Sequence, residues 1–247
     1  MRLKLKIILP LLAIFPYIVG FSPPDSGMGT SISVSAGRGV YPTASCSQRY
    51  RNEYSEAAVN LDHQIKTSDR SWTTPDYVTL GAFAEVGSDK KTLVHDADGN
   101  PTGATTNSEI SAVGAHVALD WKMIGVDVGA MGLKLPDDSG TFLMPRLGLR
   151  LGIPQFYVSA TVLSGSPIIS DGNTVNAGVG TQLGSAQFWA GLGGIAQEGS
   201  QGVGIFRAGY NFKPVVLHFT LQGDIQSNRA HSENYGMSAG LEFRLPK

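Results

Sequence analysis

Apolar and polar residues alternate along most of the chain, and the last segment shows this most clearly. From Asn234 to Leu245 every second residue is apolar, and the residues between them are small, polar or charged, including Glu242 and Arg244. A period of two is typical of a β-strand whose two faces meet different surroundings. A strand of about ten residues that is apolar outside and polar inside is the repeating unit of a transmembrane β-barrel.

The same pattern recurs along the chain and predicts about twelve strands. We expect them at residues 30–36, 54–66, 77–86, 109–121, 124–135, 142–151, 156–163, 174–183, 188–195, 203–212, 215–225 and 234–245. Residues 37–53 and 87–107 are polar and are interpreted as long loops. Segment 54–66 also fits a helical stripe, so a helix that plugs the barrel is the alternative; a strand is favoured because it keeps the strand number even.

Very short turns alternate with longer connections, as in an antiparallel up-and-down barrel of the outer-membrane type. The predicted fold is therefore all-β, a transmembrane barrel of about twelve strands, with a soluble β-sandwich as the structural alternative. Aromatic residues stand beside the short turns and predict a girdle at one membrane interface. Its members are Trp121, Phe156, Phe188, Phe212 and Phe243.

Charged residues within the predicted strands fall on the face opposite the apolar one. An arginine facing lipid near the middle of the membrane costs about 2–4 kcal/mol, so these charges are expected inside the barrel. The expected lumen set is Asp62, His116, Asp120, Asp127, Arg146, Arg150, Arg207, His218, Asp224, Glu242 and Arg244. Such a set favours either a charged constriction in a pore or a salt-bridged interior that conducts nothing.

The final strand also resembles the C-terminal assembly signal of bacterial outer-membrane proteins. Ser238, Gly240, Phe243 and Leu245 give that order: a polar residue, a glycine, then two large apolar residues one position apart. The chain continues with Pro246 and Lys247, whereas this class usually stops on an aromatic residue. The resemblance is to the whole class. It implies the outer membrane of a Gram-negative-type bacterium, with the membrane lipid and the barrel-assembly machinery as partners.

The first residues read as a secretory signal. A basic start is followed by an apolar core too short to span a membrane, and cleavage is expected after Gly20. The expected organisation is a signal peptide at 1–20, a flexible leader at 21–29 and the barrel at 30–247. Only 16% of the residues are charged and 31 are glycines, as expected for a membrane-facing β protein. Cys46 is the single cysteine, so an internal disulfide is excluded.

Three motifs suggest chemistry, and each has a simpler explanation. The Gly-x-Ser-x-Gly pattern at 236–240 would need a strand-to-helix elbow, and the glycine-rich run at 191–196 would need a following helix. Asp96 and Asp98 do not have the spacing of a calcium loop. We expect no enzyme activity, no cofactor, no metal and no nucleic-acid partner. The expected function is a narrow passive pore for small hydrophilic solutes, with a closed structural or adhesin-type barrel as the alternative and a membrane-embedded hydrolase as a remote one.

Overall fold

The structure is a computed structural model that describes residues 29–45, 48–67, 73–96, 98, 100–134, 141–164, 174–195, 202–224 and 235–245. The expected signal peptide and Cys46 lie outside these residues. In the described part, no helix is long and apolar enough to cross a membrane.

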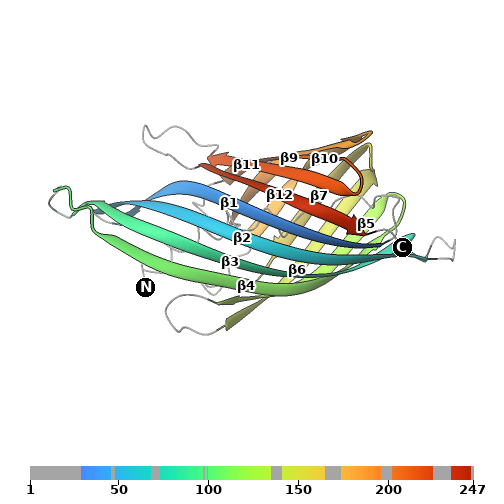
Figure 1. The fold of residues 1–247 in the computed structure, drawn as a ribbon, viewed down its shortest axis with the longest axis horizontal. Coiled ribbons are helices and arrows are strands. Elements are labelled where there is room, and N and C mark those ends of the chain that lie inside the picture. Colours follow the sequence, from blue (N-terminus) through green and yellow to red (C-terminus); the bar gives the residue numbers. More distant parts are fainter. Residues whose placement is uncertain are drawn as a thin grey trace.

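Twelve antiparallel strands close into a barrel over the described residues (Figure 1). Each strand pairs with its neighbours in sequence, and β1 closes the ring against β12 from Thr30 with Leu245 to Val40 with Tyr235. The predicted fold class is confirmed. The strands are β1 Gly29–Ser45, β2 Gln48–Lys66, β3 Tyr77–His95, β4 Thr105–Asp120, β5 Ile124–Lys134, β6 Thr141–Ile153, β7 Phe156–Leu163, β8 Thr174–Leu183, β9 Ala186–Ile195, β10 Gly202–Asn211, β11 Val215–Asp224 and β12 Tyr235–Leu245.

The barrel is apolar outside and polar inside, the reverse of a soluble sandwich. Along β6, Leu147, Leu149 and Leu151 point outward and are 44–56% exposed, whereas Arg146 and Arg150 point inward and are at most 5% exposed. Because side chains alternate along a strand, one register places every second residue in the interior. The outer surface therefore suits a lipid environment.

The two ends of the barrel differ. At one end, which we call the turn end, β1 begins and β12 ends. Successive strands are connected there by the short turns 121–123, 154–155, 184–185 and 212–214 and by the longer connection 67–76. Gly184 adopts a φ of +62°, which suits glycine because a side chain is strained there. At the opposite loop end, most connections are longer.

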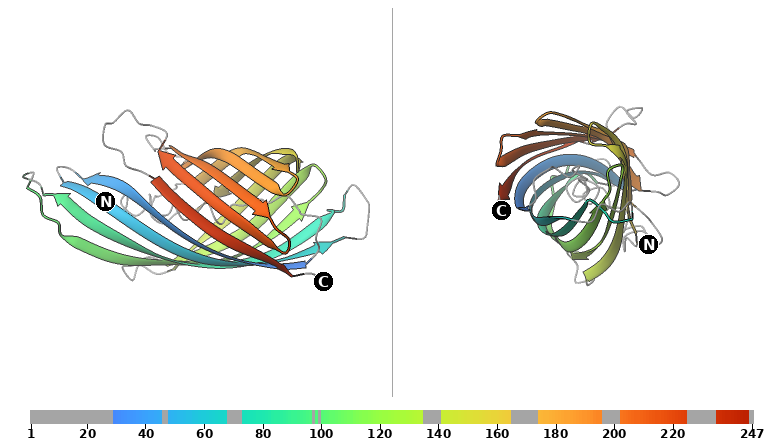
Figure 2. Two further views of the ribbon diagram at one scale, coloured as in Figure 1. Left: turned by 45° about the horizontal axis from the view of Figure 1, so that its top comes forward. Right: turned by 90° about the vertical axis from the view of Figure 1, so that its right-hand side faces the viewer.

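Strands β1 to β4 are longer than the rest and extend past the other strands at the loop end (Figures 1 and 2). On their outer faces the continuous run of apolar residues ends at one level, at Arg38, Ser55 and Ser88, which are in register. Beyond that level most outer residues are polar, with Val40 and Val94 as exceptions. Residues 48–55 continue β2 beyond that level by about 25 Å, at about 3.3 Å per residue. We call the part of β1 to β4 beyond this level the projecting sheet.

This sheet corrects two expectations. Residues 37–53 and 87–107 are not long loops: β1 and β2 occupy the first range except for residues 46 and 47, and β3 and β4 leave only 96–104 between them in the second. This sheet lies beyond the apolar band of the outer surface, so neither of its faces needs apolar residues and the alternating pattern is lost. Segment 54–66 is strand, as favoured over the plug helix.

Candidate functional site

The interior of the barrel is the candidate site, and Tyr54 shows how its side chains are arranged. The Tyr54 hydroxyl oxygen accepts a hydrogen bond from Gln222 Nε2 at 2.6 Å. Tyr54 is on β2 and Gln222 on β11, with β1 and β12 between them. At these two strands the residues in register are Gly39 and Gly236, and a Cβ atom on either would overlap the tyrosine side chain. The tyrosine therefore lies flat along the wall.

Other large inner-face side chains also lie over glycines of neighbouring strands. Tyr157 and Trp189 lie in register on either side of Gly180, and Phe83 is in register with Gly114. A Cβ on either glycine would overlap the adjacent ring. The large side chains thus occupy the space that the glycines, which have no side chain, leave along the wall. Their bulk stays out of the central space.

The charged residues follow the same arrangement and form a chain of contacts over five strands. Asp62 on β2 contacts His116 on β4, with 3.2 Å between Oδ1 and Nε2, across Gly81 on β3. His116 Nδ1 lies 3.3 Å from Asp127 Oδ2 on β5. Arg146 Nη2 on β6 donates to the same Asp127 oxygen at 2.6 Å. Four of the eleven expected lumen residues therefore form one network.

A second ion pair lies closer to the turn end. Arg150 Nη2 donates to Asp120 Oδ1 at 3.0 Å, and Arg150 Nη1 donates to the carbonyl oxygen of Gly152 at 2.9 Å. Gly125 on β5 is in register between the two charged residues. Arg150 is 1% exposed and Asp120 4%, so the pair is part of the packed wall.

The remaining lumen candidates form two further groups. Glu242 on β12 contacts His218 Nε2 at 3.0 Å and accepts a hydrogen bond from Arg244 Nε at 2.7 Å. The Arg207 guanidinium lies 5.0 Å from the ring centre of Trp189, a cation–π geometry. Asp224 ends β11, and its side chain lies outside the described part. The structure thus places the ten described candidates inside the barrel, and their role in selectivity stays a prediction.

Sequence reasoning missed three carboxylates on the inner face: Glu56 on β2, and Glu85 and Asp89 on β3. They are 8%, 3% and 8% exposed. Both carboxylate oxygens of Glu85 and Oε2 of Glu56 are buried with no hydrogen-bond partner in the described part of the chain. Glu85 stands between Ala84 and Val86 in an alternating strand, so the pattern that revealed Asp62 could have found it. Asp89 fell in a segment interpreted as a loop.

The aromatic residues of the expected girdle all lie at the turn end. Phe156, Phe188, Phe212 and Phe243 are on the outer surface, 38–64% exposed, and Trp121 follows β4 directly. Phe212 also contacts Tyr210, with ring centres 4.6 Å apart. This arrangement fits an interface, and the girdle and the assembly signal in β12 stay predictions.

The motifs that suggested other chemistry lie in ordinary structural settings. Residues 236–240 are part of strand β12, without the elbow that a serine nucleophile of this pattern needs. Residues 191–195 end β9. The Asp96 carboxylate accepts hydrogen bonds from the backbone N–H groups of Asp98 and Asn100, at 2.9 and 2.8 Å, which closes a turn between β3 and β4.

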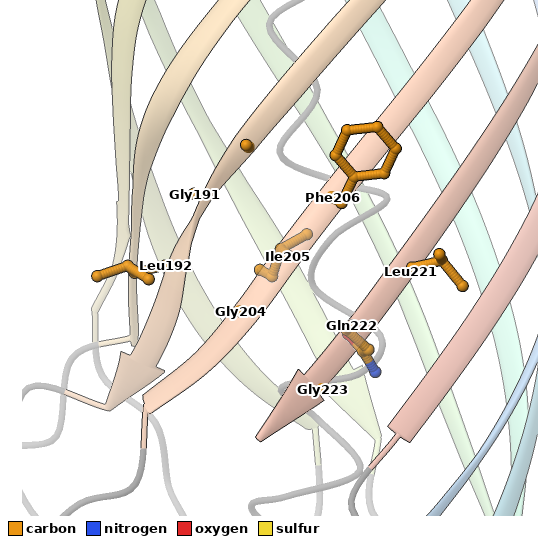
Figure 3. Close-up of a pocket in the computed structure, with 9 residues that line it drawn as sticks. Gly191, Leu192, Gly204, Ile205, Phe206, Leu221, Gln222 and Gly223 are labelled. Carbon is orange, nitrogen blue, oxygen red and sulfur yellow. The ribbon is translucent and has the colours of Figure 1, made fainter. Parts of the chain in front are cut away.

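An apolar hollow of about 510 Å³ lies on the outer surface near the loop end of β9 to β11. Leu192, Phe206 and Leu221 stand around it on the near side of the strands, whereas Ile205 and Gln222 point to the far side (Figure 3). Outward-facing Gly204 and Gly223 leave the space between them. The hollow is part of the apolar outer surface and is separate from the lumen.

Comparison with solved structures identifies barrels of the same architecture. The chain is similar to a KdgM porin (TM-score 0.53, 10% identity, covering 87% of this chain and 99% of that one). It is also similar to the transport unit of the autotransporter AIDA-I from Escherichia coli (TM-score 0.59, 9% identity, covering all of both chains). A third similar structure is the translocator domain of the autotransporter NalP from Neisseria meningitidis (TM-score 0.60, 10% identity, covering 98% of this chain and 96% of that one).

No protein-family model matches the chain, and no curated protein does. The solved structures share so little sequence with it that they show the fold alone. The chain has the fold of bacterial outer-membrane β-barrels.

Proposed function

We propose that this barrel is a narrow passive pore for small hydrophilic solutes in the outer membrane of a Gram-negative-type bacterium. The observation that carries the proposal is the placement of large inner side chains over glycines. Tyr54 over Gly39 and Gly236 is the clearest case. A barrel that is closed by its own interior would have such side chains pointing to the centre, where they would pack against one another.

The lining of the interior supports passage of polar solutes. Ion pairs such as Arg146 with Asp127 lie against the wall, and small polar residues of β1, including Ser31, Ser33 and Ser35, face inward. A polar interior holds water, and charges fixed along it select among solutes by charge. Twelve strands also enclose more space than eight, where side chains fill the interior.

The orientation follows from the connections between strands. Outer-membrane barrels have short turns on the periplasmic side, so the turn end faces the periplasm and the projecting sheet faces the outside of the cell. The membrane lipid contacts the apolar outer band, and the barrel-assembly machinery would recognise β12. We expect no enzyme activity, because the inner serine of β12, Ser238, lies in a regular strand among the described residues.

Solute flux into liposomes tests this proposal. Mature protein is refolded into liposomes loaded with an impermeant polymer, and swelling is followed in isotonic solutions of sugars of increasing size. We expect rapid swelling in small sugars and none in large ones. Swelling no faster than in protein-free liposomes, with the protein shown to be inserted, would overturn the proposal.

The projecting sheet favours a second function, binding of a partner outside the cell. Its outer face is polar and carries the ion pairs of Glu53 with Arg38 and Arg51, both at 3.5 Å. Replacing residues 43–50 with Asn-Gly would shorten β1 and β2 while keeping a hairpin. Loss of cell adhesion with unchanged solute flux would assign binding to the sheet; unchanged adhesion would remove this second function.

A further inference from the structure

We propose that the pore prefers cations, because the inner faces of β2 and β3 form a line of carboxylates leading from the loop end into the lumen. We call these four residues, Asp89, Glu56, Glu85 and Asp62, the acidic track. The inference rests on the proposed pore function and specifies the charge of the preferred solutes. These are small inorganic cations and cationic organic molecules.

The register of β2 and β3 sets the order of the track. Asp89 pairs with Tyr54 at the base of the projecting sheet, and Glu56 pairs with Gly87 just below it. Glu85 pairs with Ala58, so it is the diagonal neighbour of Glu56. Asp62 lies further towards the turn end, opposite Gly81. All four are on the inner faces of two adjacent strands.

Asp62 contacts His116, whereas Glu56 and Glu85 have no ion pair in the described part of the chain. Arg146 and Arg150 are occupied by Asp127 and Asp120, on strands other than β2 and β3. Glu85, by contrast, is 3% exposed, and neither of its oxygens has a hydrogen-bond partner in the described part of the chain. An ionised carboxylate removed from water and left without a partner is unstable, so it takes up a proton or a cation.

The elements around Glu56 and Glu85 supply few other charges. On β1 and β12 the residues in register with Glu56 are Gly37 and Ser238, and on β4 the residue in register with Glu85 is Ala112. Within the acidic track, Asp89 adds a further negative charge on β3. The inward-facing basic residues around the track are His116 on β4, which contacts Asp62, and Lys91, towards the outside of the cell. Arg146 on β6 and Arg207 on β10 lie further around the barrel.

The arrangement of the acidic track suits the passage of cations better than the binding of a metal ion at one fixed site. No group of three His, Cys, Asp or Glu residues in the described ranges is arranged to hold a metal ion. Carboxylates spaced along a wall instead give a mobile cation successive weak sites, which is the condition for conduction. Anions meet the same charges as a barrier.

Reversal potentials in planar bilayers test the inference. Single channels are recorded across a tenfold KCl gradient at pH 8 for the natural protein, for Glu85→Gln, and for the double variant Glu56→Gln with Glu85→Gln. Glutamine keeps the shape of each side chain and removes the charge. Glu109→Gln is the matched control, because Glu109 makes the same charge change on the outer face of β4.

We expect the natural pore and the control to pass potassium better than chloride. The double variant should lower the potassium-to-chloride permeability ratio by at least about twofold, since it removes two carboxylates from the wall along which the cations pass. A pore that prefers chloride, or an unchanged ratio in the double variant, would overturn the cation preference and leave the pore standing. The absence of current from all inserted proteins would overturn the pore itself.

Discussion

Tyr54 and Gln222 are joined by a 2.6 Å hydrogen bond although two strands separate them in the barrel wall. The contact exists because Gly39 and Gly236 occupy the intervening positions of the same row. Side chains that lie along the wall in this way keep their bulk out of the centre of the barrel. This relationship connects the glycine content of the sequence to an open lumen.

Replacing Gly39 with valine tests that connection. The new side chain would overlap the Tyr54 ring, which must then turn into the lumen. We expect lower single-channel conductance and a loss of about 1–3 kcal/mol in unfolding free energy from overpacking.

The control for this substitution removes the ring. In the double variant Gly39→Val with Tyr54→Ala, the overlap no longer exists, so conductance should return to the natural value or above it. Conductance that stays low in the double variant would show that valine acts in some other way than through Tyr54.

The Arg150–Asp120 pair gives a prediction about stability. Changing Asp120 to asparagine removes the partner of the Arg150 side chain, which is 1% exposed. The unpaired buried charge should destabilise the barrel by about 3–5 kcal/mol. Urea unfolding in lipid, followed by tryptophan fluorescence, measures the change. Asp98→Asn, in an exposed turn, is the control and should shift stability by no more than about 0.5 kcal/mol. Equal stability of the two variants would contradict the assigned ion pair.

The outer surface gives a prediction that depends on depth in the membrane. Leu149→Arg places a charge on the lipid face within β6 and should cost about 2–4 kcal/mol. Ile153→Arg, at the turn end of the same strand and the same face, should cost about 0–1 kcal/mol. Unfolding in liposomes measures both. If the two variants lose the same stability, the outer face or the position of the membrane is assigned wrongly.

Labelling of whole cells tests the position of the projecting sheet. In a Cys46→Ser background, Lys90→Cys on the outer face of β3 should react with a membrane-impermeant maleimide, because it lies beyond the apolar band. Lys122→Cys, in a connection at the turn end, should react only after the outer membrane is opened, because the proposed orientation places that end in the periplasm. Protection of the first cysteine, or reaction of the second in intact cells, would reverse the orientation.

The sequence predicted the barrel well where a strand has an apolar outer face and a polar inner face. Along β6 and β12 the contrast between the two faces is strong, and those strands were expected within about two residues of their observed bounds. The projecting sheet was missed because it lies beyond the apolar band, where both faces are mostly polar. Its residues, such as Arg51 and Lys90, carry no alternation that distinguishes strand from loop.

The partners of the lumen charges could not be read from the sequence. Alternation indicated that Arg146 and Arg150 face inward, but it gave no partner for either side chain. Pairing each with a carboxylate depends on the register between strands, which places Asp120, Gly125 and Arg150 in one row. Since Arg150 is buried in that pair, its neutralisation is now expected to affect folding as well as selectivity.

The central claim is an open, water-filled lumen, and single-channel recording of the refolded mature protein in a planar bilayer tests it most directly. The wall-lying side chains predict discrete, reproducible current steps of one size in symmetrical KCl. Sustained silence from protein shown to be inserted in the bilayer would contradict the claim, and would assign the barrel a closed interior and a role at its projecting sheet.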